Sequence, residues 1–208
     1  MMRDFRKDQI LETIKLHSKF TKEIEKKVKE TPAVVLENKV SPFARKIYTF
    51  TKDVYREFER ARQFARTRII AEKFFCGVFV AKHNIAGMIL DFFHKRFPAY
   101  TLCLYNKKRK QTFIMNRDGN SSVFEGGLEK ALLSMDVKPG HFKKGFGQHN
   151  SIEESIKEMY DAFYESQYIK DRKNPRYYRQ MIPKSVKEDY ELDIEKRIGN
   201  QQLDKYLK

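Results

Sequence analysis

The sequence has no tryptophan, only two cysteines among 208 residues, and no apolar run long enough to cross a membrane. Two cysteines do not make a disulfide framework, so we expect a reducing, cytoplasmic location. Cys76 and Cys103 both lie in apolar segments, where they either face each other across adjacent strands or serve as small buried side chains. The first residues lack the apolar core of a signal peptide, so neither secretion nor membrane association is expected.

Signatures of catalysis and of cofactor binding are also missing. The glycines around His141 and His149 form neither a dinucleotide-binding pattern nor a Walker A pattern, and the two histidines have no third ligand at suitable spacing. No metal and no cofactor are therefore predicted. Acid or base chemistry would fall to His83, Asp91 or His94, but Asp91 and His94 have the spacing of a surface pair on one helix. Whether the chain is an enzyme stays open.

A large excess of positive charge is what the sequence does contain. Lysine and arginine outnumber aspartate and glutamate by 43 to 28, which gives a net charge of +15. A field of this size favours polyanions, so nucleic acid is the expected partner, although a basic composition also serves solubility. The 17 phenylalanines and 11 tyrosines are enough for a hydrophobic core.

The pattern between residues 66 and 116 predicts the fold. Short β-branched and aromatic runs alternate with one segment, residues 83–97, in which apolar residues recur at helical spacing after Asn84 as a potential N-cap. This is a ββαββ order. We expect an α+β protein with a small antiparallel sheet packed with N-terminal and C-terminal helices.

The whole chain is expected to form a single domain. Its parts are N-terminal helices in residues 1–65, the ββαββ core in 66–116, an irregular loop region in 117–150 and a helical C-terminal part in 151–208. In the first part, residues 8–29 are predicted as one helix and residues 43–64 as another, started by Ser41 and Pro42. The side of this second helix that faces away from its apolar stripe carries Arg45, Lys46, Lys52, Arg56, Arg60 and Arg62. That face could contact phosphates, or Glu57 and Glu59 could neutralise part of it.

A second basic stretch, residues 168–187, interleaves cations with tyrosines. Guanidinium groups pair with phosphates and tyrosine rings stack on bases, so this composition suits nucleic acid. The predicted phosphate contacts are Arg172, Lys173, Arg176 and Arg179, with Tyr177 and Tyr178 as stacking groups. Further nucleic-acid contacts are predicted at Arg66, Arg68, Lys82 and Arg96. Ordering of a turn bounded by two prolines is the alternative role of the first group.

Several of these stretches resemble a family of unknown function that is described as a probable DNA-metabolism protein. The resemblance rests on residues 66–116, with KHN at 82–84 and FFHKRFP at 92–98, on the block 159–186, and on LDKYL at 203–207. It covers about the last two thirds of the chain. The tryptophan that often follows the Pro-Lys element in the family is absent here.

The resemblance implies a role in DNA repair or DNA modification. Relatives occur beside a radical-SAM protein proposed to modify or repair DNA, or are fused to uracil-DNA glycosylases, so either protein is an implied partner. The chain lacks the cysteines of both. We therefore expect a DNA-binding accessory protein. The alternatives are a repair or modification enzyme with an unidentified active site and an RNA- or ribosome-associated basic protein.

Overall fold

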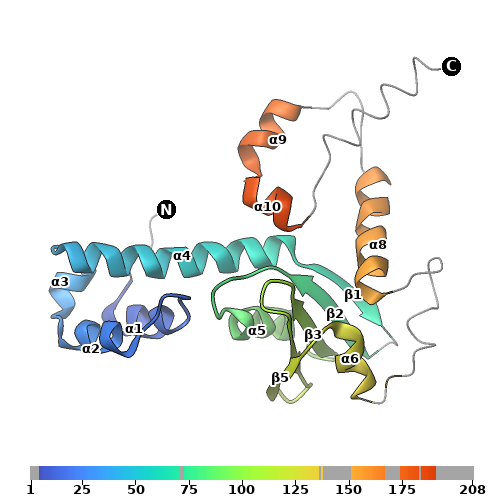
Figure 1. Cartoon of the computed structure of the whole chain (residues 1–208), viewed down its shortest axis with the longest axis horizontal. Coiled ribbons are helices and arrows are strands. Elements are labelled where there is room, and N and C mark those ends of the chain that lie inside the picture. The colour runs from blue at the N-terminus through green and yellow to red at the C-terminus, as the bar shows by residue number, and fades with distance from the viewer. Residues whose placement is uncertain are drawn as a thin grey trace. The chain divides into compact units, whose positions relative to one another are not determined.

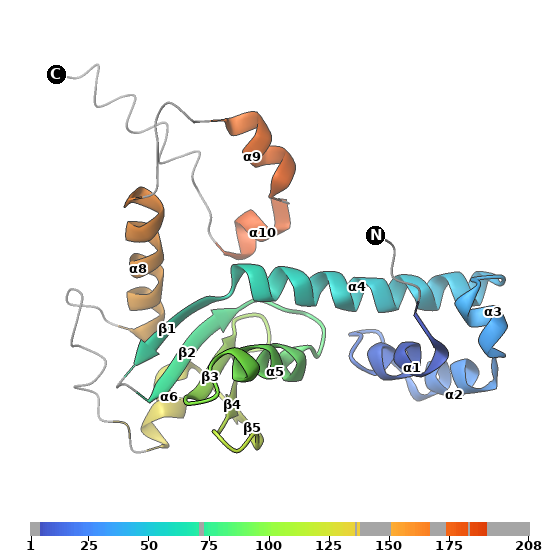
Figure 2. The same cartoon turned by 180° about the vertical axis from the view of Figure 1, so that it is seen from behind.

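A computed structural model of the chain describes residues 5–70, 73–135, 137, 151–166, 174–182 and 184–190. The chain divides into two compact units, Met1–Lys157 and Glu158–Lys208. Figures 1 and 2 show the elements from opposite sides. Among the described residues, no helix has the length and apolar character needed to span a membrane.

The first unit begins with three short helices, α1 (Lys7–Lys15), α2 (Lys22–Glu30) and α3 (Ala33–Glu37). Residues 8–29 were expected to form one helix, and this prediction is wrong. The chain leaves the helical path after α1, and Thr21 starts α2 as an N-cap whose side chain accepts a hydrogen bond from the Ile24 amide. The break allows both helices to bury apolar side chains in one cluster against the start of α4.

The long helix α4 (Pro42–Phe64) begins where the sequence predicted. The Ser41 side chain accepts from the Ala44 amide at 3.1 Å, and Pro42 occupies the first helical position. One face of α4 buries Ala44, Ile47 and Tyr48 among α1–α3, and Val54 and Ala61 further along belong to the core beneath the sheet. The same helix therefore connects both apolar clusters (Figure 1).

The sheet contains five strands in the order β1-β2-β3-β4-β5. The strands are β1 (Arg66–Ile70), β2 (Phe74–Phe79), β3 (Thr101–Asn106), β4 (Gln111–Met115) and β5 (Ser121–Glu125). The α+β class and the ββαββ order of the core are confirmed, and β5 is an additional strand. Three pairs are antiparallel, but β2 and β3 are parallel. The expected all-antiparallel pairing is wrong here because the helix between these strands returns the chain to the end where β2 began.

That crossover helix is α5 (Ala86–Arg96). It packs on β3 and β4 and also contacts α4 (Figure 2). Phe75 and Phe79 from β2, Leu102 and Leu104 from β3, and Ile89 from α5 belong to the main core cluster. Cys76 and Cys103 point to the opposite face and have no exposed surface, so both faces of the central strands are covered.

Two more helices complete the first unit. Helix α6 (Leu128–Leu133) packs on β3, and α8 (Ile152–Ser166) begins in the first unit and continues into the second. The Ser151 side chain accepts from the Glu154 amide at 3.2 Å and so caps the start of α8. The Arg68 guanidinium of β1 donates to the Ser155 hydroxyl, which links the edge strand to the first turn of α8.

In the second unit the structure describes the rest of α8, α9 (Pro175–Met181) and α10 (Lys184–Asp189). Asn174 caps α9 by accepting from the Tyr177 amide at 2.9 Å. Pro175 is the first residue of α9, within the stretch where the sequence indicated a turn bounded by two prolines. Of the helical C-terminal part predicted for residues 151–208, residues 191–208 lie outside the described residues.

Candidate nucleic-acid interface

The solvent-facing side of α4 carries a stripe of cations, Arg45, Lys52, Arg56 and Arg60. Successive members are separated by seven, four and four residues, or about two turns, one turn and one turn at about 3.6 residues per turn. Arg45, Arg56 and Arg60 are exposed and Lys52 is half-buried. These four residues are called the α4 stripe below. They share one side because the apolar positions of the helix occupy the other.

Few carboxylates neutralise the α4 stripe. Arg56 lies 3.8 Å from Asp53, a long, exposed contact that contributes little stability. Glu59 pairs instead with Arg62, which lies outside the stripe. Within the part of the chain that the structure describes, no carboxylate lies within 4.0 Å of the charged groups of Arg45, Lys52 or Arg60. The stripe therefore keeps most of its positive charge.

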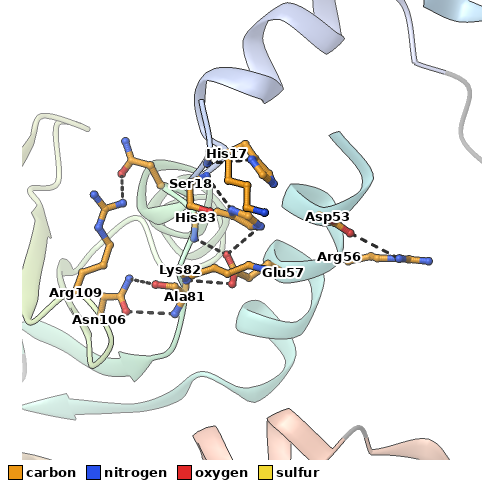
Figure 3. Close-up of polar contacts among 12 residues, drawn as sticks. His17, Ser18, Asp53, Arg56, Glu57, Ala81, Lys82, His83, Asn106 and Arg109 are labelled. Carbon is orange, nitrogen blue, oxygen red and sulfur yellow. Dashed lines mark hydrogen bonds and ion pairs between the residues drawn. The ribbon is translucent and has the colours of Figure 1, made fainter. Parts of the chain in front are cut away.

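Glu57, also on α4, holds the loop that leads from β2 into α5. Its two carboxylate oxygens accept from the backbone amides of Lys82 at 3.0 Å and His83 at 2.7 Å (Figure 3). The Glu57 side chain is 19% exposed, and both donors belong to consecutive residues. Glu57 was expected to neutralise part of the basic face of α4. Instead, its carboxylate binds backbone amides rather than the arginines of its own helix.

Two buried imidazoles lie beside this loop. The rings of His17 and His83 are 4.4 Å apart, and His17 also stacks on Phe50 at 4.0 Å. Nδ1 of His83 accepts from the Ser18 amide at 3.1 Å, so the proton of the neutral ring is on Nε2, which has no hydrogen-bond partner and lies 4.0 Å from Glu57. The pKa of each ring is lowered to about 4, mainly because the ring is buried. The positive charge of a neighbour is the second cause. This neighbour is His83 in the case of His17, and Lys82 in the case of His83.

Asn106, at the end of β3, ties the same loop to the β3–β4 turn. Its side chain accepts from the Ala81 and Lys108 amides and donates to the Ala81 carbonyl at 2.9 Å. Next to it, the Arg109 guanidinium donates to the Asn84 side chain at 3.3 Å. Asn84 was expected to cap α5, and this is wrong. Ile85 occupies the N-cap position of α5 without a side-chain hydrogen bond.

A family model matches the chain from residue 6 to residue 189. The chain belongs to the DUF4130 family, a domain of unknown function. The match extends from the N-cap of α1 to the last residue of α10, so the DUF4130 domain includes every helix and strand described above. Comparisons with curated proteins and with solved structures gave no match.

In the structure of this DUF4130 domain, the predicted nucleic-acid contacts of the C-terminal part differ in their exposure to solvent. Arg176 is exposed on α9, and Tyr177 beside it is 57% exposed. Tyr178 is half-buried, with the Lys187 ammonium 4.4 Å from the centre of its ring. Arg179 is part of α9. Arg172 and Lys173 lie outside the described residues.

The remaining predicted contacts are scattered over the first unit. Arg66 is buried, and Arg68 is half-buried with its guanidinium on Ser155. Lys82 is exposed on the loop that Glu57 holds. Arg96 is exposed at the end of α5, with its guanidinium 5.8 Å from the centre of the Phe97 ring. Of these four residues, only Lys82 lies on the β2–α5 loop, which Glu57 and Asn106 hold in place.

The candidates for acid or base chemistry do not come together. His83 is buried with Nδ1 already bonded, Asp91 is exposed and His94 is half-buried. Among the described residues, no three histidine, cysteine or acidic side chains form a group that could hold a metal ion. The pairing of His17 with His83 has no signal in the sequence, because the two residues are 66 positions apart and neither belongs to a motif.

Proposed function

We propose that this DUF4130 protein binds nucleic acid, DNA in preference to RNA, and acts as an accessory protein in DNA repair or DNA modification. The observation that carries the proposal is the α4 stripe. Its four cations share one side of a rigid helix, and among the described residues only Arg56 has a carboxylate within 4.0 Å of its charged group. From Arg45 to Arg60 the stripe extends over about 22 Å, at about 1.5 Å per residue. This length lies alongside several consecutive phosphates of a nucleic-acid strand.

The exposed side of α9 supports the same function with different chemistry. Arg176 supplies a charge for a phosphate, and the exposed ring of Tyr177 offers a face on which an unpaired base can stack. The helix is fixed at its start by the Asn174 cap, so the two side chains project from an ordered backbone.

The DNA assignment and the accessory role are supported by the resemblance to the DNA-metabolism family. In this proposal the protein brings a radical-SAM enzyme or a uracil-DNA glycosylase to its substrate. Co-purification from cells that contain both candidate enzymes tests the partner. Recovery of neither enzyme, with DNA binding intact, would remove the partner from the proposal and leave the binding function.

Binding itself is tested by fluorescence anisotropy with a labelled DNA duplex at increasing salt. Each phosphate contact contributes about 0.9 to the slope of log affinity against log salt, so changing the four residues of the α4 stripe to glutamine should lower the slope by about 2 to 4. The matched control changes four lysines of α1 and α2, Lys15, Lys22, Lys26 and Lys29, to glutamine. The control removes the same charge from a region where Glu25 and Glu30 already pair with three of these lysines.

Two outcomes would contradict the proposal. A wild-type affinity that hardly changes with salt would mean that phosphate contacts are not the basis of binding. Equal losses in the stripe variant and in the control would mean that total charge alone matters. Competition by structured RNA at equal length and fixed salt distinguishes DNA from RNA, and stronger competition by RNA would favour an RNA-associated protein.

A further inference from the structure

The turn between β3 and β4 places four consecutive cations, residues 107–110, at the tip of a two-stranded hairpin. All four side chains are exposed. The strands pair in antiparallel register up to Asn106 and Gln111, and the Lys110 amide closes the turn on the Asn106 carbonyl at 2.8 Å. Lys110 has a φ of 56°, in the left-handed region that a tight turn requires. The turn therefore concentrates positive charge on a short, closed backbone.

This turn is anchored to the rest of the unit. Asn106, only 1% exposed, holds the Lys108 amide and both backbone groups of Ala81, and the Lys107 amide donates to the Phe79 carbonyl at 3.1 Å. A charged turn with an ordered backbone loses little conformational entropy when a ligand binds. Such anchoring is what a preorganised binding surface needs.

The turn is also connected to the α4 stripe. Arg109 bonds to Asn84, and the residues just before Asn84 are held by Glu57, which follows Arg56 on α4. Figure 3 shows Arg109 and Arg56 on opposite sides of the contacts between Glu57 and the loop, with Lys82 between them. Exposed cations thus run from the hairpin tip through Lys82 to the α4 stripe.

We propose that Lys82, Lys108 and Arg109 form a second phosphate-contact surface, and that one nucleic-acid molecule contacts this surface and the α4 stripe together. This inference rests on the proposed function and adds the residues that would fix the nucleic acid in one orientation. Phosphate contacts at two sets of residues on a rigid body set the register of a duplex, whereas one stripe alone allows sliding along its axis.

The test changes Lys82, Lys108 and Arg109 together to glutamine in the full-length chain. Lys107 is kept because it interacts with Glu153, and Lys110 is kept because of its left-handed backbone. Anisotropy with a labelled duplex should show a salt slope lower by about 2 to 3 than that of the wild type. The matched control changes Lys15, Lys26 and Lys29 to glutamine, and a charge-preserving variant, Lys82→Arg, Lys108→Arg and Arg109→Lys, should keep the wild-type slope.

The outcomes separate this inference from the proposed function. If the triple glutamine variant behaves like its control while the α4 variant loses affinity, the second surface is refuted and the proposed function stands. If neither variant changes binding, or the wild type does not bind, both proposals fail. The inference would also be overturned if the triple glutamine variant lost binding to phosphatidylserine vesicles but kept its binding to DNA. If both sets contact one molecule, the slope changes of the two variants should add in a combined variant.

Discussion

Cys76 on β2 and Cys103 on β3 are in-register partners across the parallel strand pair, and neither has exposed surface. Both alternatives expected from the sequence therefore hold at once. The side chains are opposite neighbours on adjacent strands, and they are also small buried side chains. Both cysteines are free thiols in the structure.

This arrangement predicts that the thiols are unreactive in the folded protein. Hydrogen bonding to Cys103, together with burial, raises the pKa of the Cys76 thiol well above its ordinary value, and only the thiolate attacks a disulfide reagent. Titration with Ellman's reagent at mildly alkaline pH should detect no thiol in the native protein and both after unfolding in guanidinium. Rapid modification of either thiol under native conditions would contradict the buried geometry.

The histidine pair predicts that stability falls as the solution becomes acidic. The pKa values of His17 and His83 are lowered from 6.5 to about 4 in the folded protein, so the unfolded chain binds more protons between these values. The stabilising contribution is complete above about 6.5 and is lost as the pH falls toward 4. It amounts to about 3 to 4 kcal/mol at most for each ring, at about 1.4 kcal/mol per unit of pKa.

Urea unfolding over this pH range measures the effect. The charges around the two rings are those of Lys19, Lys82 and Asp53, with the Glu57 carboxylate 4.0 Å from His83. The variant His17→Phe keeps an aromatic ring against Phe50 but removes one titrating group, so its stability should depend less on pH than that of the wild type. An unchanged pH dependence would assign the effect to carboxylates elsewhere.

Gly77 should not tolerate a side chain. A Cβ atom at this position would lie 2.7 Å from Cγ2 of Thr67 and 2.9 Å from Cδ2 of Leu104, inside the main core. We expect Gly77→Ala to lower the free energy of unfolding by about 1 to 3 kcal/mol. Gly87→Ala is the matched control, because nothing lies within 4 Å of its Cβ and alanine favours a helix by about 1 kcal/mol over glycine. Equal effects of the two changes in urea unfolding would refute the steric argument.

Glu57 should matter more for stability than its neighbours on α4. Glu57→Ala leaves the amides of Lys82 and His83 without an acceptor, and we expect a loss of about 1 to 3 kcal/mol in the free energy of unfolding. Glu59→Ala removes only a half-buried pair with Arg62 near the surface and should change stability by less than about 1 kcal/mol. Thermal and urea unfolding of both variants would reveal the difference, and a similar loss in each would count against the role of Glu57.

The two neighbouring tyrosines of α9 should differ in nucleic-acid binding. The exposed ring of Tyr177 is available to an unpaired base, whereas Tyr178 is half-buried with Lys187 over its ring. Tyr177→Ala should weaken binding of a single-stranded oligonucleotide by about 1 to 3 kcal/mol, and Tyr178→Leu should weaken it much less. Fluorescence anisotropy at fixed salt measures the affinity of both variants. A larger loss of affinity in Tyr178→Leu than in Tyr177→Ala would assign the stacking role to Tyr178.

Local patterns in the sequence predicted the types of most helices and strands and identified the residues that can carry charge. The helical spacing of apolar residues in α4, with Ser41 and Pro42 at its start, placed that helix correctly, because amphipathic period and capping are local properties. The alternation in residues 66–116 indicated the first four strands for the same reason. The prediction of one N-terminal helix was wrong because α2 packs against α1, which in turn packs against α4, and this packing requires the break before Thr21.

Which residues contact one another could be learned only from the three-dimensional fold. The parallel pairing of β2 with β3 follows from the crossover of α5, and the contacts of His17 with His83 and of Glu57 with the loop at Lys82 join positions far apart in the chain. Arg66 and Arg109 look alike in the sequence, yet the first is buried beside β2 and the second is exposed on a turn. The charge of a side chain follows from its residue type. Its exposure and its partners depend on long-range packing, which the local spacing of residues does not predict.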